Sequence, residues 1–207
     1  MIIMRLQLLI LIALFGFGAC SPSKKETASD AAQENNTETS KPEGIIINPQ
    51  TEADTLKGSP KAYIQAKIGN TNFEINYYSP ATRGRMIWGG LVAFGNVWVT
   101  GAHKATSIEF DRDIKIGNST VVAGKYAFFT IPGEREWTVI INKNWNQHLA
   151  DDYNQAEDLV RISVIPSTEG KHQERLRYVI ESKDDASGEI VMNWDKLEVS
   201  VPFKILL

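Results

Sequence analysis

The sequence predicts an all-β domain, an antiparallel β-sandwich of about ten short strands with little helix. Apolar side chains recur at every second residue through most of the chain after residue 58, as expected of strands with one buried face. Turn-forming pairs such as Gly69-Asn70 and Gly117-Asn118 separate these runs. No long stripe with the 3.6-residue period of a helix occurs. A jelly roll is one form that such a sandwich takes.

The expected strands follow one another along the chain, and each has one apolar and one polar face. Their expected ranges are 63–68, 72–78, 107–111, 113–116, 120–122, 137–141, 160–164, 176–180 and 197–205. The last range alternates most regularly, with Leu197 and Val199 on the side opposite Glu198. Pro202 lies within it and has no N–H to donate, so we expect this position at a sheet edge or a bulge. A single helical turn is expected over 155–159.

The first twenty residues are typical of a secretory signal. One arginine precedes the almost continuously apolar residues 6–17, and Gly18-Ala19 stands directly before the chain's only cysteine, Cys20. The apolar run is too short to span a bilayer. Its end resembles the lipobox of bacterial lipoprotein signals, in which the cysteine is acylated and the chain is cut before it. The alternative is an ordinary signal peptide or an N-terminal membrane helix.

We therefore expect a signal peptide over 1–19 and a lipid anchor on Cys20, with the bilayer as a partner of the acylated thiol. Each methylene of the acyl chains, palmitate for example, contributes about 0.8 kcal/mol when buried. Ser21 does not match the aspartate that retains lipoproteins at the inner membrane. By analogy with lipoprotein sorting, we expect the periplasmic face of the outer membrane of the cell envelope. With Cys20 acylated, no thiol remains for a disulfide, a zinc site or catalysis.

Composition divides the remaining chain into a tether and one domain. Residues 21–57 are rich in small and polar residues and poor in aromatic ones, so they cannot bury enough apolar area to offset chain entropy. We expect a lipidated Cys20 and a disordered tether over 20–57, followed by one β-sandwich domain over 58–207. The apolar triplet Ile45–Ile47 either docks on the domain as an edge strand or belongs to the tether, and we favour the tether.

Charge and motifs exclude several classes of protein. The formal net charge is −3, and no basic stripe indicates nucleic acid as a partner. The chain has no phosphate-binding loop, dinucleotide fingerprint or Gly-x-Ser-x-Gly context. The His-Glu-x-x-His spacing of a zinc enzyme does not occur either. The sequence therefore indicates no cofactor, no metal and no particular reaction.

Residues 77–106 do not alternate regularly and hold an unusual density of glycine, tryptophan and arginine. A long irregular connection in a compact domain is usually functional or an ordered Ω-loop. The motifs are Gly-Arg-x-Ile-Trp-Gly-Gly-Leu-Val, Gly-x-Val-Trp-x-Thr-Gly-Ala and, after this connection, Ala-Gly-x-Tyr-x-x-Phe-x-Ile-Pro-Gly. They resemble domain of unknown function 2911, a family of secreted or lipid-anchored bacterial proteins, over roughly residues 59–203.

The resemblance implies a β-rich envelope domain and carries no established chemistry. Val99 stands where that family typically has arginine. His103 and Lys104 stand where an asparagine and an acidic residue often follow. A role that depends on the arginine is therefore not transferred to this chain.

Several residues in and near the irregular connection could form a site. Arg83 and Arg85 could clamp a carboxylate or phosphate, or they pair internally with acidic residues or stack on Trp88, which we favour. The tryptophans could form an aromatic platform, but those within strand patterns are expected in the core. Trp145 is the best exposed candidate, because polar residues surround it. His103, near the end of this connection, is a further candidate.

We favour binding or assembly, with the loops of residues 77–106 and the loop around Trp145 holding a small ligand, a glycan or an envelope protein. The candidate binding residues are Tyr78, Arg83, Arg85, Trp88, Thr100, His103, Trp145 and His148. A hydrolase acting on an envelope polymer is one alternative, with His103, His148 and Asp151 or Asp152 as acid–base groups if the two loops meet. A purely structural lipoprotein is the other.

Overall fold

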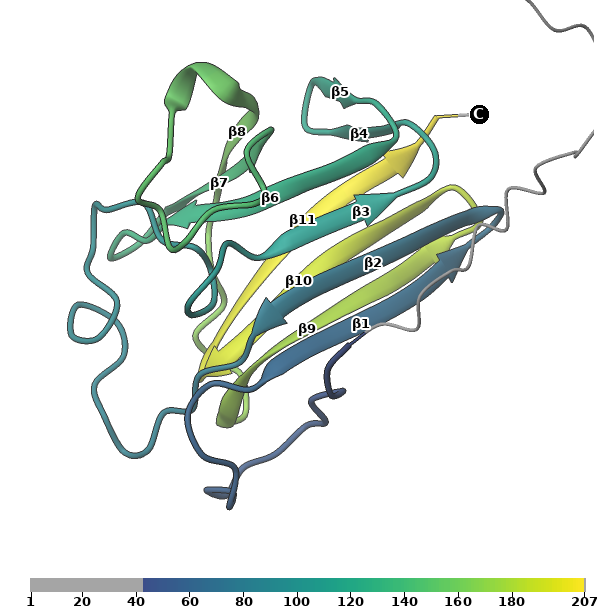
Figure 1. Ribbon diagram of the computed structural model, residues 1–207. Coiled ribbons are helices and arrows are strands. Elements are labelled where there is room, and N and C mark those ends of the chain that lie inside the picture. The colour runs from purple at the N-terminus through teal and green to yellow at the C-terminus, as the bar shows by residue number, and fades with distance from the viewer. Residues whose placement is uncertain (1–42, 207) are drawn as a thin grey trace, which may run out of the picture. The chain divides into compact units, whose positions relative to one another are not determined.

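Two antiparallel sheets packed face to face make up residues 43–206, the part of the chain that the computed structural model describes (Figure 1). The first sheet has the order β1 (Lys61–Ile68), β2 (Thr71–Tyr78), β3 (Ser107–Phe110), β6 (Gly124–Ile131), β7 (Trp137–Asn142) and β8 (Asp158–Val164). The second has the order β5 (Ser119–Val121), β4 (Ile114–Ile116), β11 (Leu197–Ile205), β10 (Ser187–Asp195) and β9 (Gln173–Asp184). The predicted antiparallel β-sandwich is confirmed.

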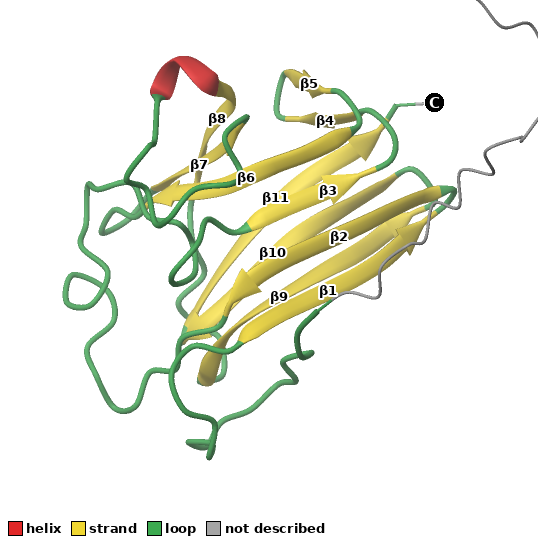
Figure 2. Ribbon diagram, in the orientation of Figure 1, coloured by secondary structure: helices red, strands yellow, loops and turns green. Residues whose placement is uncertain are grey.

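Most neighbouring strands are consecutive in the chain, so the sandwich is built mainly from hairpins rather than as a jelly roll. The expected helical turn is a short 3-10 helix, η1 (Gln155–Glu157), drawn red in Figure 2. Among residues 43–206, no helix is long and apolar enough to cross a membrane. The predicted signal peptide over 1–19 and the lipidated Cys20 lie outside the described residues.

The core lies between the two sheets and is filled by alternate residues of each strand. In β2, Phe73, Ile75 and Tyr77 are buried, and in β11 every second residue from Leu197 faces inward. Pro202 directly precedes Phe203, the first residue of β11 that pairs with β4. β4 therefore does not extend to Pro202, and on that side of β11 no strand needs the backbone N–H that proline lacks.

The pattern of β6 escaped prediction because both faces of this strand are covered. Phe128 faces the main core, whereas Phe129 belongs to a second small cluster on the outside of the sheet with Val99 and Ala105. The chain of residues 97–106 lies over this outer face, and Trp98 and Thr130 exchange backbone hydrogen bonds. A strand that is buried on both faces has a continuous apolar sequence, and periodicity alone does not show whether such a sequence forms a strand or a helix.

Residues 43–58, called the strap here, lie against the domain along the edge where β1 and β9 end the two sheets. Ile45 forms a parallel bridge with Ala62 of β1, and Ile47 is buried in the main core. Gln50 accepts a backbone hydrogen bond from Glu174 of β9 at 2.9 Å. This stretch therefore differs from the free tether expected up to residue 57, and Ile45–Ile47 dock as the other alternative foresaw. Covering the edges also limits pairing with other chains.

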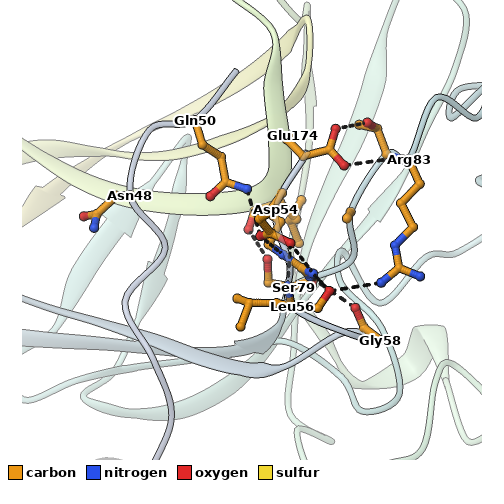
Figure 3. A network of polar contacts seen from close by, with 12 residues as sticks. Asn48, Gln50, Asp54, Leu56, Gly58, Ser79, Arg83 and Glu174 are labelled. Carbon is orange, nitrogen blue, oxygen red and sulfur yellow. Dashed lines mark hydrogen bonds and ion pairs between the residues drawn. The ribbon is translucent and has the colours of Figure 1, made fainter. Parts of the chain in front are cut away.

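Arg175 of β9 explains why a strap of tether-like composition packs on the domain (Figure 3). Its side chain is fully buried and forms a bidentate ion pair with Asp54 of the strap, with Nη2 2.9 Å from Oδ1. The same guanidinium donates to the carbonyl oxygens of Leu56 at 2.6 Å, Gly58 at 3.2 Å and Ser79 at 2.8 Å. A buried charge is tolerated only when it is paired and hydrogen-bonded throughout, and the strap supplies most of these acceptors.

Replacing Asp54 by alanine removes the counter-charge of a buried guanidinium. Breaking a buried ion pair by removing one partner costs about 3 kcal/mol or more, so we expect Asp54→Ala to lower the free energy of unfolding by that amount in a urea titration. The matched control is Lys183→Gln, which removes an exposed ammonium group 3.3 Å from Glu189 and should change stability little. Equal stability of Asp54→Ala and the wild type would contradict the role of the pair.

The same ion pair makes stability depend on pH. The hydrogen bond from Arg175 lowers the pKa of Asp54 below its ordinary value of 3.8. The native state therefore binds this proton less readily than the unfolded chain. Its stabilisation is fully present above the unfolded-state pKa and is lost as the pH falls through the native-state pKa. We expect Asp54→Asn to lose less stability than the wild type between about pH 6 and about pH 3, as urea midpoints would show.

Candidate functional site

A groove of about 540 Å³ runs over the outer face of β1, β2, β3 and β6. Its floor comes from the outward-facing residues of these strands, and its walls come from the start of the strap and the loops that hold Lys104 and Trp145. Its lining residues are Glu43, Lys61, Glu74, Asn76, Tyr77, Tyr78, Lys104, Ala105, Ser107, Lys125, Trp145 and Asn146. The volume lies within the range of small-molecule sites, but the lining is richer in charge than most such sites.

Strand register brings the floor of the groove together. Tyr78 of β2 lies opposite Lys61 of β1, and Asn76 lies opposite Ser107 of β3. Because the side chains at 73, 75 and 77 enter the core, Glu74, Asn76 and Tyr78 face the outside of the sheet. The floor is thus a polar surface on a rigid sheet.

The two loops that form one wall are joined through their backbones. The N–H of Ala105 donates to the carbonyl of Gln147 at 3.1 Å, and the N–H of Leu149 donates to the carbonyl of His103 at 2.8 Å. Lys104 and His148 form an isolated antiparallel bridge. The loops around residues 103 and 148 therefore meet, as the hydrolase hypothesis requires.

Most of the charged side chains that line the groove already have partners within the domain. Lys61 lies 2.6 Å from Glu43, and its hydrogen bond lowers the pKa of that carboxyl below 4.5. The ammonium group of Lys125 lies 4.7 Å from the ring centroid of Trp145, a cation–π distance. Glu74 accepts hydrogen bonds from Gln65 at 2.8 Å and from Asn76 at 2.6 Å.

Lys104 has no side-chain hydrogen bond or ion pair within residues 43–206, although it lines the groove. The lining contains three lysines and two glutamates, and one of these glutamates is already paired with Lys61. Lys125 is itself paired, since its ammonium group lies 3.4 Å from the carboxylate of Glu109. The groove can therefore accept an anionic group near Lys104, on the side of the groove that holds Trp145.

Three of the candidate residues lie in or beside this groove. Tyr78 and Trp145 line it, and the ring of His103 packs edge-on against Tyr78 at 5.1 Å between centroids. The imidazole of His148 instead pairs with Asp151 at 2.9 Å on the exposed surface. No group of three His, Cys, Asp or Glu side chains in residues 43–206 could hold a metal ion.

The guanidinium groups of Arg83 and Arg85 bond to the backbone of their own domain and do not form a joint clamp for a ligand. The guanidinium of Arg83 donates to the carbonyl of Leu56 in the strap at 3.2 Å, as Figure 3 shows. Arg85 donates to the carbonyl of Ala81 at 2.6 Å and to that of Thr82 at 3.1 Å. Both bond to backbone carbonyls, whereas the favoured interpretation expected acidic side chains or stacking on a tryptophan.

Glu174 holds the backbone at the beginning of the same connection. Its carboxylate accepts hydrogen bonds from the hydroxyl of Thr82, from the N–H of Arg83 at 3.0 Å and from Nε2 of His172 at 3.2 Å. Burial raises the pKa of Glu174, but these hydrogen bonds outweigh it and leave the pKa lowered. Arg83 has a positive φ of 49°, and this contact fixes it there.

Trp88 and Thr100 are packed into the fold, Trp88 half-buried against the main core and Thr100 fully buried. Trp88 packs with Trp137, Trp98 and Trp194, with ring centroids 4.9, 5.8 and 5.6 Å away. These rings close one end of the main core. Thr100 is fully buried, and its carbonyl accepts hydrogen bonds from the hydroxyl of Tyr178 at 2.7 Å and from Thr106 at 3.0 Å.

Sequence reasoning missed most of the groove. Lys61, Glu74, Lys104 and Lys125 were not singled out, because a charged residue on the polar face of a strand is ordinary. The signal that could have found them is strand order, since the outward-facing residues of β1, β2, β3 and β6 become one surface only when these strands are neighbours.

A family model described as "Protein of unknown function (DUF2911)" matches residues 59–203. No curated protein and no solved structure matches the chain.

Two tryptophans test which candidate side chains are structural. Trp88 is half-buried and packs against three other tryptophans, so we expect Trp88→Ala to cost about 3 kcal/mol and to lower the Tm by roughly 10 °C in a domain of this size. Trp145 is 40% exposed, and Trp145→Ala should shift the Tm by no more than roughly 2 °C. Differential scanning calorimetry distinguishes them, and similar shifts for both variants would refute this division of roles.

Proposed function

The chain belongs to the DUF2911 family of proteins of unknown function, and on that premise we propose that it is a lipid-anchored envelope protein that binds an acidic saccharide in the groove beside Trp145. The anchor is the acylated Cys20 at the periplasmic face of the outer membrane. The residues between Cys20 and the strap tether the sandwich to that membrane. The sandwich presents the groove to a ligand in the periplasm.

The amino-terminal sequence supports the anchor. A short apolar run ends in Gly18-Ala19-Cys20, and the polar composition that follows would not continue a membrane helix. The family model begins at residue 59, so this argument rests on the chain's own sequence and not on the match.

Cys20→Ser removes the thiol that would be acylated. We expect the wild-type protein to fractionate with membranes and to gain the mass of acyl chains, and we expect Cys20→Ser to be released as a soluble protein or to remain unprocessed. Cell fractionation and mass spectrometry of the intact protein measure both effects. A Cys20→Ser protein that is processed and still fractionates with membranes would rule out this anchor.

The observation that carries the binding proposal is that Lys104, which has no side-chain partner among the described residues, lines the same groove as the exposed ring of Trp145. A tryptophan ring offers a flat apolar face for the C–H groups of a sugar ring, and its edge tolerates water. The ammonium group of Lys104 suits a carboxylate on that sugar. Asn76, Asn146 and Glu74 add amide and carboxylate groups that bind hydroxyls.

The groove supports binding better than hydrolysis. The rings of His103 and His148 have separate partners, Tyr78 and Asp151, although their loops are joined. General acid–base catalysis requires the two groups to reach one reacting bond. A purely structural role would leave the exposed Trp145 and Lys104 without a use.

Isothermal titration with a hexamer of galacturonic acid tests the groove, and maltohexaose is the neutral comparison. We expect the acidic oligomer to bind and the neutral one to bind at least about tenfold more weakly, a difference of 1.4 kcal/mol. Binding of the acidic oligomer should weaken with added salt, because Lys104 is exposed. Lys104→Gln and Trp145→Ala should each reduce its affinity by about tenfold or more.

The control variant is Lys115→Gln, which removes an exposed lysine of β4 in the other sheet. It should bind the acidic oligomer like the wild type. Equal affinity for the neutral and acidic oligomers would refute the charge requirement. No heat from either oligomer, or equal loss in Lys115→Gln and Lys104→Gln, would count against the groove itself.

A further inference from the structure

We propose that residues 86–94, called the apolar loop here, form a second contact with the membrane, at the surface of an anionic bilayer. The inference rests on the lipid anchor proposed above but not on the saccharide groove. It concerns how the domain sits on the bilayer to which it is tethered.

The apolar loop buries some of its apolar side chains and exposes others. Ile87 is buried and Trp88 packs into the tryptophan cluster, so these two residues hold the loop on the core. Met86, Leu91 and Phe94 are instead 73%, 49% and 38% exposed. Burying an exposed methionine, leucine or phenylalanine side chain is favourable by about 1.5–3 kcal/mol, so three on one loop form an apolar surface that water disfavours.

The loop is held in shape while these side chains remain outside. The N–H of Leu91 donates to the carbonyl of Met86 at 3.1 Å, and the N–H of Gly89 donates to the carbonyl of Val92 at 2.9 Å. Gly89 has a positive φ of 75°, and the ring of Phe94 lies over it so closely that a Cβ there would come within 2.8 Å of the ring. An ordered loop presents its apolar residues without a further cost of ordering.

Exposed apolar residues concentrate at the end of the sandwich to which the apolar loop belongs. This end holds the last residue of β2, Tyr78, and the first residue of β1, Lys61, which are paired. The large exposed apolar side chains here are Leu56, Met86, Leu91, Phe94 and Ile165. Those of the opposite end, where β2 begins and β6 starts at Gly124, are Val122 and Leu206 within the described residues.

The tether joins the domain at this same end. Glu43, the first described residue, forms an ion pair with Lys61. Figure 1 shows the strap and the long chain between β2 and β3 at one end of the two sheets. A chain that leaves from Glu43 toward a lipidated Cys20 therefore leaves from the end that carries the apolar loop.

Charge identifies the bilayer as the occupant rather than a second copy of the chain. Arg83 and Arg85 directly precede the apolar loop, and both are exposed residues. No acidic residue occurs between residues 83 and 95. Apolar side chains flanked by cations are the combination that binds at a membrane interface, because the cations meet anionic headgroups while the apolar groups enter the acyl boundary. Two copies joined through this loop would bring their arginines close to one another, and such like-charge contacts are unfavourable.

An environment-sensitive fluorophore at Leu91 tests the contact. The full acylated chain carrying Leu91→Cys is labelled with nitrobenzoxadiazole and reconstituted into vesicles of phosphatidylethanolamine and phosphatidylglycerol. We expect a blue shift of the label's emission, and quenching by lipids that carry a nitroxide just below the headgroup. Val122→Cys, whose parent residue is 57% exposed at the opposite end, is the matched control and should keep the emission of a label in water.

A Leu91 label with the emission of the Val122 label, on protein that floats with the vesicles, would overturn the proposal. A blue shift that rises with protein concentration in detergent and without vesicles would assign the loop to a second copy and overturn it equally. Replacing Met86 and Phe94 by serine in the labelled chain should abolish the blue shift. Equal shifts in vesicles of phosphatidylcholine alone would remove the role of the arginines.

The wild-type chain separates failure of the anchor from failure of the loop. Its only cysteine is Cys20, so an acylated wild-type protein takes up no fluorophore. Labelling of the wild type would show that the anchor is absent. The loop is then tested in Cys20→Ser/Leu91→Cys protein mixed with the same vesicles, where an unshifted Leu91 label again overturns the proposal.

Discussion

The buried guanidinium of Arg175 is the constraint on which the other parts of the domain depend. It joins β9 to the strap through Asp54 and to the end of β2 through the carbonyl of Ser79. Its neighbour Glu174 fixes the backbone of Thr82 and Arg83, where the irregular connection begins. One short stretch of β9 therefore determines where the strap lies and where the connection that bounds the groove starts.

Much of the fold could be predicted from the sequence, because a strand with one buried face has apolar and polar residues in alternation. β2 and β11 are clear examples. β6 is not, since Phe128 and Phe129 are both buried, each in a different cluster. The docked strap was not the favoured prediction for another reason. Its polar composition is that of a tether, and its polar groups are held on the domain by hydrogen bonds to Arg175, which is distant in the sequence.

The candidate site was predicted in part. Trp145 and Tyr78 could be chosen because an aromatic ring in polar surroundings is unusual, and both line the groove. Lys104 and Lys125 could not be chosen, because a single lysine is ordinary in a sequence and only its surroundings in the fold make it a candidate. Those surroundings come from β3, β6 and two loops that are far apart in the chain. The arginines of the connection show the reverse case, since Arg85 is unusual in sequence yet bonds only to nearby carbonyls among the contacts described.

The position of the strap has a mechanical consequence. In a chain anchored at Cys20 as proposed above, tension would reach the described part of the domain at Glu43, where an exposed ion pair with Lys61 and the bridge from Ile45 to Ala62 precede Asp54. Exposed pairs are weak and buried ones resist rupture. Tension would thus peel the outer part of the strap while Arg175 holds the remainder, so that the tether can lengthen and shorten without opening the core.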